Sequence, residues 1–223
     1  RPPRSTPSNS SAASDVYKRQ AMKAIRAAAA ALLLASHPVI SVNGNTAALA
    51  GKWVIELAEI VNAKIEVNLF YRTKEREKAI ESLLRELGAK EVLGTDENAL
   101  ATIPELMSER RKVDPRGILI ADVVLVPLED GDRTEALRKM GKTVITIDLN
   151  PLSRTARAAS ITIVDNIVRA MPKLIDEASK LRNAPRQELE SILSSYDNTA
   201  ILADVLNHII NRLKKLQSKN IQN

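Results

Sequence analysis

Residues 121–150 read ADVVLVPLEDGDRTEALRKMGKTVITIDLN, and this stretch decides the fold. It begins with a continuous apolar run at 121–127, which is typical of a strand buried on both faces. A helical pattern follows at 133–140 and ends at Gly141, a usual helix stop. The β-branched run at 143–149 then predicts a second strand. Because a strand–helix–strand unit joins parallel strands by a right-handed crossover, the stretch indicates an α/β sheet.

The same alternation extends through most of the chain. We expect further strands at 38–42, 64–69, 91–93 and 160–164, and helices at 21–36, 46–61, 73–87 and 166–181. Thr73 and Gly88 mark the two ends of one of these helices, as N-cap and as C-terminal stop. The sequence therefore predicts an α/β fold with a mostly parallel sheet flanked by helices.

The two ends of the chain depart from this pattern. Residues 1–20 are polar, rich in Pro and Ser and without periodicity, so we expect a disordered leader. They resemble cloning-adapter sequence, and we therefore expect a non-native segment in place of the protein's own N-terminus. Residues 184–223 predict a C-terminal helical region, split near 196–198, that packs on the domain or on a dimer partner. Residues 21–183 then form one α/β domain.

Residues 21–36 allow two interpretations. Lys23 and Arg26 stand ahead of an apolar run at 27–35, which is the order of a signal peptide. The alternative is a core-packing helix that stops before Pro38. The run is too short to span a bilayer, and a strand follows at once, so we favour the packed helix.

Composition narrows the classes of function. Hydrophobic residues make up 44% of the chain and aromatic residues 2%, so the core is aliphatic. The chain has 33 Lys and Arg and 27 Asp and Glu, and this excess of positive charge weakly favours anionic ligands. The small number of aromatic residues argues against RNA binding. The absence of Cys excludes disulfides, thiolate catalysis and zinc fingers. We expect a cytoplasmic protein without nucleic-acid or membrane partners.

Polar loops follow five of the predicted strands, and in open α/β sheets ligands bind beyond the carboxyl ends of the strands. The first loop holds Asn43, Gly44, Asn45 and Thr46. Gly44 allows close backbone approach to a ligand, and Asn45 or Thr46 can cap the next helix, whose free N–H groups attract anions. A capped turn without a ligand explains these residues equally well.

The second and third loops carry charged residues. Asn68 and Arg72 can contact a phosphate or a carboxylate, although a helix cap with a solvated Arg72 explains that loop better. The third loop places Glu129, Asp130 and Asp132 after a buried strand. Three carboxylates can hold Mg²⁺ together with phosphate oxygens, whereas acids at a helix N-terminus also complement the helix dipole. The number of acids favours a functional site.

The fourth loop follows the strand at 143–149. Its Asp148, Asn150, Arg154 and Thr155 put a carboxylate, an amide, a guanidinium and a hydroxyl at one edge of the sheet. The fifth loop ends at Asn166, where a helix begins whose amides can face a nucleotide. The two loops together predict a ligand site at this edge.

Other sites receive less support. Residues 96–116 are irregular and polar, which makes them a candidate active-site loop. His37 and His208 stand at positions where histidine is more often structural. Neither a dinucleotide glycine fingerprint nor a Walker A loop is present, which disfavours an NAD-dependent oxidoreductase.

Several stretches together resemble the archaeal phosphopantothenate synthetases, also called 4-phosphopantoate–β-alanine ligases. They are HPVISVNGNTAALA at 37–50, KIEVNLFYRT at 64–73, ADVVLVPLEDGDRTEALRKMGK at 121–142, and TIDLNPLSRTA and ITIVDNIVRA within 146–170. The resemblance implies a Rossmann-like homodimeric enzyme of archaeal coenzyme A biosynthesis. Its reaction joins 4-phosphopantoate to β-alanine with ATP and yields 4-phosphopantothenate, AMP and pyrophosphate through an acyl-adenylate.

The resemblance also implies a set of ATP-binding residues: Asp148, Leu149, Asn150, Arg154, Thr155, Asn166 and Ile167. We expect Mg²⁺ near the phosphates, and substrate contacts from Asn43, Asn45, Arg72 and Asp130. Adenylation activates a carboxylate without a nucleophilic side chain, which agrees with the lack of Cys. The family's N-terminal segment carries ATP-contacting arginines that residues 1–20 replace here. A nucleotide-binding regulatory or scaffold module without turnover is the alternative.

Overall fold

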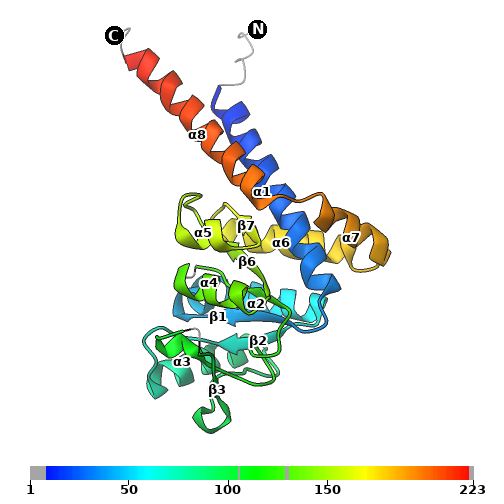
Figure 1. Cartoon of the computed structure of the whole chain (residues 1–223), viewed down its shortest axis with the longest axis vertical. Helices are drawn as coiled ribbons and strands as arrows, with labels where there is room; N and C mark the ends of the chain where they lie inside the picture. The colour runs from blue at the N-terminus through cyan, green and yellow to red at the C-terminus, as the bar shows by residue number, and fades with distance from the viewer. Residues whose placement is uncertain (1–8, 105, 129–130, 221–223) are drawn as a thin grey trace, which may run out of the picture.

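The computed structural model describes residues 9–104, 106–128 and 131–220, and a parallel sheet with the strand order β2-β1-β5-β6-β7 lies at its centre (Figure 1). The strands are β1 (Pro38–Val42), β2 (Lys64–Val67), β5 (Val123–Leu125), β6 (Thr143–Ile147) and β7 (Ile161–Ile163). A small antiparallel pair, β3 (Ala101–Thr102) and β4 (Lys112–Val113), lies apart from it. The predicted α/β fold with a parallel sheet is confirmed.

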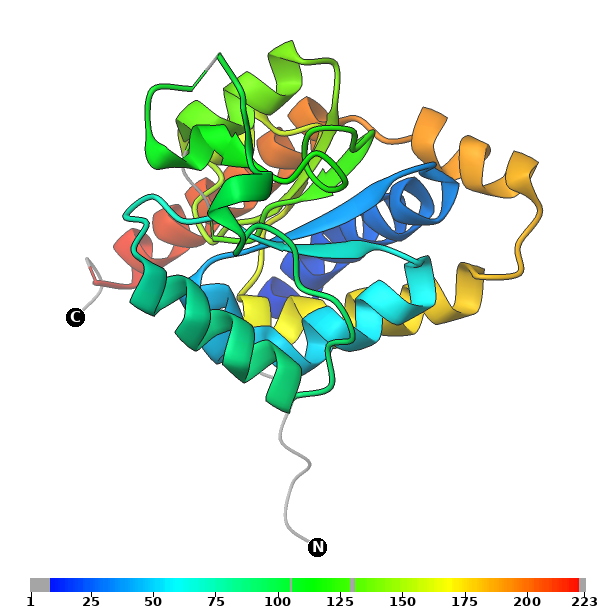
Figure 2. The ribbon, with the colours of Figure 1, turned by 90° about the horizontal axis from the view of Figure 1, so that it is seen from below.

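Helices cover both faces of this sheet (Figure 2). On one face pack α1 (Asn9–Leu34), α2 (Gly44–Val61), α3 (Lys74–Glu86) and α6 (Ile167–Leu181). The other face is covered by α4 (Gly131–Lys139) and by the segment at 96–121, which contains η1 (Glu97–Ala99) and η2 (Glu109–Arg111). The strands are therefore buried on both sides, as their continuous apolar runs predict.

Helix α1 is a core helix, as predicted for residues 21–36. Its Ala24, Ile25 and the residues at 27–32 are at most 2% exposed and pack with α6 and the sheet. The small alanine side chains let the helix approach the sheet closely. Within the described ranges, no helix combines the length and the apolar character that crossing a membrane requires.

Helix α1 begins at Asn9, ahead of the predicted start at residue 21, while residues 1–8 lie outside the described ones. The expected disorder of residues 1–20 stays a prediction. Once the Ala-rich segment has nucleated a helix, each added residue contributes a further hydrogen bond. The side chain of Gln20 also donates a 2.9 Å hydrogen bond to Asp204 of α8. That residues 1–20 are non-native stays a prediction.

The predicted strand at 91–93 is reduced to a single bridge. Leu93 pairs with Glu66 alone, through Leu93 N to Ile65 O and Val67 N to Leu93 O, both 2.9 Å. Gly94 follows with φ +82°, and this left-handed residue turns the chain away from the sheet. The prediction that this segment is buried is confirmed for Val92 and Leu93, but the prediction of a strand is wrong, because only Leu93 pairs with β2.

The C-terminal region consists of α7 (Arg186–Ser194) and α8 (Asn198–Asn220), split where the sequence predicts. Asn198 pins the start of α8 to the sheet, because its Oδ1 accepts from Thr162 N at 2.8 Å and its Nδ2 donates to Ala156 O and Ala159 O. The rest of α8 runs beside α1 and projects beyond the sheet (Figure 1).

Candidate functional site at the carboxyl edge of the sheet

The direction of the connections reverses between β1 and β5. The chain leaves β1 through α2 to reach β2 on one side, and later builds β5, β6 and β7 on the other. Connections that leave neighbouring strands in opposite directions open a crevice at the carboxyl ends of those strands, where ligands of such folds bind. The polar loops singled out in the sequence all lie at this edge.

Asn43 joins the loops that follow β1 and β5. Its Oδ1 accepts from Thr46 N at 2.9 Å, which caps α2, and its Nδ2 donates to Leu128 O at 3.2 Å. The Thr46 hydroxyl donates to Pro127 O at 3.4 Å. Leu128 has φ +53°, a conformation that costs a branched residue energy and that gathers at functional sites. Two side-chain hydrogen bonds therefore join the loop after β1 to the loop after β5.

One detail of the first loop differs from expectation. Asn43, not Asn45 or Thr46, caps α2, since only a residue one position before the helix has the extended backbone that a cap requires. Asn45 is exposed on the first turn. No protein atom requires a glycine at position 44, because an added Cβ would come no nearer than 3.9 Å to Ile80. That Gly44 allows close approach to a ligand stays a prediction.

The acidic third loop can be followed only in part. Glu129 and Asp130 lie outside the described residues. Within the residues that are described, no three His, Asp or Glu side chains are grouped as a metal site would require. Asp132 pairs with Arg154 across a distance of 2.8 Å, so this acid joins the third loop to the fourth.

The fourth loop is held in place by its own polar side chains. Asp148 accepts from Asn150 N at 2.8 Å and from the Ser153 hydroxyl at 2.5 Å. Asn150 accepts from Leu152 N at 3.0 Å, and Ser153 caps α5 (Arg154–Ala158) by accepting from Ala156 N at 2.9 Å. These bonds preorganise the loop, and its backbone keeps one shape before any ligand arrives.

Arg154 is oriented by α4. Its Nε and Nη2 donate to the two carboxylate oxygens of Glu135 at 3.2 and 2.9 Å, and its Nη1 lies 2.8 Å from Asp132. The side chain crosses Gly131, where an added Cβ would lie 2.4 Å from that of Arg154. Hydrogen bonds from Glu135 and Asp132 raise the pKa of Arg154 above its ordinary value, so the guanidinium stays charged. The sequence analysis missed Glu135.

The fifth loop lies beside the fourth because β6 and β7 are neighbours. Asp148 N donates to Ile163 O at 3.1 Å, and Asn166 caps α6 by accepting from Val168 N at 3.0 Å. The seven residues that the resemblance assigns to ATP therefore stand at two adjacent strand ends. Leu149, Asn150 and Arg154 are exposed, Asp148 and Asn166 are half-buried, and Thr155 and Ile167 are buried.

Arg72 and Asn68 lie at the end of β2, and the solvated Arg72 that the sequence favours is wrong. The Arg72 side chain is 2% exposed, with Nη1 3.0 Å from Glu77 Oε1 and Nη2 3.4 Å from Val67 O. Glu77 stands in the first turn of α3, where it turns inward toward Arg72. The equally buried Asn68 donates to Arg110 O and Lys112 O, which fastens the segment at 96–118 to the sheet.

Sequence reasoning also missed two buried charged residues near this edge. Glu66 accepts from Asp114 N at 3.0 Å and from Ile118 N at 2.6 Å, and burial raises its pKa to about 7. Arg133 of α4 is fully buried. The sequence pattern could have predicted that both side chains are buried. Glu66 lies within an apolar strand, and Arg133 stands one helical turn before the buried Ala136.

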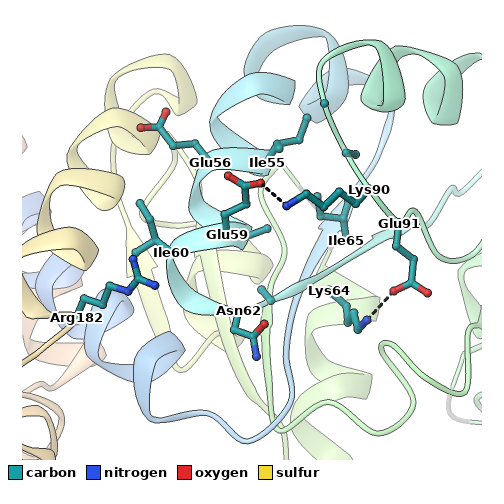
Figure 3. A pocket seen from close by; sticks show the side chains of 14 residues that line it. Ile55, Glu56, Glu59, Ile60, Asn62, Lys64, Ile65, Lys90, Glu91 and Arg182 are labelled. Atoms are coloured by element: carbon teal, nitrogen blue, oxygen red, sulfur yellow. Dashed lines mark hydrogen bonds and ion pairs between the residues drawn. The ribbon is translucent and has the colours of Figure 1, made fainter.

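A hollow of about 680 Å³ lies at the opposite edge of the sheet (Figure 3). It is lined by the end of α2 with Asn62, the start of β2, residues 88–91 after α3, and Arg182 after α6. Charged side chains there pair with one another, Lys64 with Glu91 at 2.6 Å and Lys90 with Glu59 at 3.5 Å. Paired surface charges at the amino ends of strands do not form a ligand site, so the candidate site stays at the carboxyl edge.

Comparison with known proteins shows the family. Residues 20–212 match the phosphopantothenate/pantothenate synthetase family. A protein of Thermococcus kodakarensis named 4-phosphopantoate–β-alanine ligase is 57% identical over 202 residues, covering 90% of this chain and 77% of the relative. Proteins of the same name from Methanosarcina mazei and Methanospirillum hungatei are 51% and 45% identical, covering 89% and 86% of this chain and 78% and 76% of theirs. This chain belongs to the phosphopantothenate/pantothenate synthetase family.

Proposed function

We propose that the protein is an AMP-forming ligase that joins 4-phosphopantoate to β-alanine. The observation that carries the proposal is the identity of 45–57% with relatives of that name along almost the whole α/β domain. The polar loops at the carboxyl edge are consistent with this function, because they could bind a nucleotide and a small acid next to each other.

We assign the nucleotide to the ends of β6 and β7. Arg154 faces the edge with a permanent charge, and the amides at the start of α6 favour anions because they begin a helix of 15 residues. The exposed Leu149 offers an apolar surface beside them. Mg²⁺ bound with ATP would neutralise charge on the phosphates, and phosphate oxygens and waters would supply ligands to it.

The chemistry needs positioning more than it needs a reactive side chain. A carboxylate oxygen of the acid attacks the α-phosphorus of ATP, and pyrophosphate leaves. The neutral amine of β-alanine then attacks the acyl carbonyl, loses a proton, and AMP leaves as the amide forms. Charge gathers on the α-phosphate during the first step, where a fixed guanidinium lowers the barrier. Holding both reactants at the edge contributes several kcal/mol more.

The acid and the amine occupy the part of the edge that remains, at the ends of β5, β1 and β2. We assign substrate contacts there to Asn43, Asn45 and Asp130. One of the two hydrogens of Asn43 Nδ2 donates to Leu128 O, and within the described residues the other has no printed acceptor, so it can donate to a substrate. The protein acts as a homodimer.

Measurement of AMP release from the purified chain tests the function. Release that requires ATP, 4-phosphopantoate and β-alanine together supports the ligase. ATP binding without any release under these conditions would instead indicate the non-catalytic nucleotide-binding module.

A further inference from the structure

Two residues of α4 frame the side chain of Arg154, where α4 and α5 lie side by side (Figure 1). Gly131 and Glu135 stand four positions apart in α4, so they lie on the same face of the helix, about one turn from each other. The stem of Arg154 crosses Gly131, and its guanidinium reaches Glu135. This face of α4 therefore restrains Arg154 at two points.

Gly131 provides the room for the stem. A Cβ added there would lie 2.4 Å from Arg154 Cβ, 3.3 Å from its Nε and 3.4 Å from its carbonyl carbon. Because a Cβ is fixed to the backbone and cannot rotate away, an alanine at this position would displace Arg154 and the start of α5. The glycine thus allows α4 to approach Arg154 closely.

Glu135 holds the other end of the side chain. Its two carboxylate oxygens accept from Arg154 Nε at 3.2 Å and from Nη2 at 2.9 Å, so one edge of the planar guanidinium is occupied. Asp132 Oδ1 lies 2.8 Å from the third nitrogen, Nη1. These contacts engage three of the five N–H groups of the guanidinium, so two remain that can donate to a phosphate.

The two acids have different explanations. Asp132 stands in the first turn of α4, where a negative charge stabilises the helix through its dipole, and its side chain is 74% exposed. Glu135 stands beyond that turn and makes two directed hydrogen bonds to Arg154. Because an ion pair at the surface adds little to stability, a role in the site explains Glu135 better.

That role is restraint rather than attraction. Two carboxylates beside one guanidinium leave no net positive charge to attract a polyphosphate. An arginine that is free to rotate loses its rotamer freedom when it binds a ligand, and the loss weakens binding by about two- to tenfold. Restraint of Arg154 by α4 in the free protein avoids this loss.

We propose that Gly131 and Glu135 are positioning residues for the nucleotide, and that they strengthen ATP binding through Arg154. The inference rests on the proposed ligase function and deepens it. Loss of the negative charge of Glu135 should by itself strengthen ATP binding, because like charges repel. Loss of the restraint should weaken it. The two effects have opposite signs, and only the second requires Arg154.

A double-mutant cycle separates these effects. Calorimetry measures the ATP affinity of wild type, Glu135→Gln, Arg154→Ala and the double variant. In the Arg154→Ala background, Glu135→Gln should leave the affinity unchanged or strengthen it. With Arg154 present, the same substitution should be at least about threefold less favourable to ATP binding. Equal effects in the two backgrounds would overturn the proposal.

Gly131→Ala gives an independent test, because it leaves every charge in place. It should weaken ATP binding by about two- to tenfold, and this effect should disappear in the Arg154→Ala background. Glu81→Gln is the matched control, since Glu81 holds Arg85 in a similar surface pair on α3, and its ATP affinity should equal that of wild type. Variants that lose stability in urea while the folded protein keeps its ATP affinity would show a purely structural role and overturn the proposal.

Turnover separates failure of this inference from failure of the ligase assignment. ATP binding to wild type without AMP release counts against the ligase, and the cycle still decides the positioning role. In an active enzyme, Glu135→Gln should raise the KM for ATP or lower kcat, with the KM for β-alanine within about twofold of wild type. A wild-type chain that binds no ATP would overturn both.

Discussion

At the scale of single residues, the proposed nucleotide site depends most on Arg154. Contacts with Glu135 and Asp132 orient its guanidinium in the absence of ATP. Replacing Arg154 with Ala should weaken ATP binding by about 1.5–3 kcal/mol, the scale of a charge-assisted hydrogen bond. Asn150→Ala should weaken it less, because a neutral amide is lost. Calorimetric titration of ATP into both variants measures the difference.

Arg157 provides the control for this prediction. It is exposed in the same short helix, and Arg157→Ala removes an equal charge. Its ATP affinity should stay close to that of wild type. Equal losses in the two arginine variants would point to general electrostatic attraction, and no loss in Arg154→Ala would remove the fourth loop from the nucleotide site.

Glu66 should make stability depend on pH. Burial raises its pKa from 4.5 to about 7, so between these values the folded chain holds a proton that the unfolded chain has released. Its contribution is complete below pH 4.5 and is lost as pH rises through 7, with a total of up to about 3 kcal/mol. The free energy of unfolding in urea should therefore fall from pH 5.5 to pH 8.

Glu66→Gln isolates this effect. Gln places an NH₂ group against the backbone N–H of Asp114 or Ile118, so the variant should be less stable at every pH. The comparison therefore uses the change between the two pH values and not the absolute stability. Equal changes in wild type and variant would show that Glu66 does not titrate in this range.

At the scale of elements, the segment at 96–118 packs closely against β2 at Gly117. A Cβ on Gly117 would lie 2.1 Å from Glu66 Oε2, and two hydrogen bonds prevent that carboxylate from moving away. Gly117→Ala should lower the free energy of unfolding by about 2–3 kcal/mol, as overpacking does. Gly44→Ala is the control, with its nearest neighbour at 3.9 Å, and should change stability by less than about 1 kcal/mol. Urea unfolding that ranks the two variants equally would contradict this account.

Helices could be predicted from the sequence where a long periodic pattern is bounded by a capping residue and a stop residue. Thr73 caps α3 and Gly88 follows it with φ +111°, as the sequence indicates. The segment at 96–118 could not be predicted, because its shape depends on Glu66 and Asn68, residues about 45 positions away. Such contacts arise from packing and leave no local pattern.

At the scale of the whole molecule, parallel strands bring the polar loops to one edge, and this could be predicted. The order of the strands could not, since the crossover rule sets the handedness of each connection and not the neighbour that it reaches. The buried pairing of Arg72 with Glu77 also depends on how α3 docks against β2. The sequence therefore predicts a candidate site at the carboxyl edge of the sheet, but it does not predict which charged side chains there are buried.

We predict that the outer half of α8 contacts a second copy of the chain. Ile210, Leu213 and Leu216 recur every three residues on it and are 46%, 58% and 51% exposed. Apolar side chains aligned along a projecting helix are typical of an interface. Ile210→Glu with Leu213→Glu should therefore turn a dimeric mass in light scattering into a monomeric one at micromolar concentration. Lys215→Glu on the opposite side should leave the dimer intact, and a monomeric wild-type chain would contradict the interface.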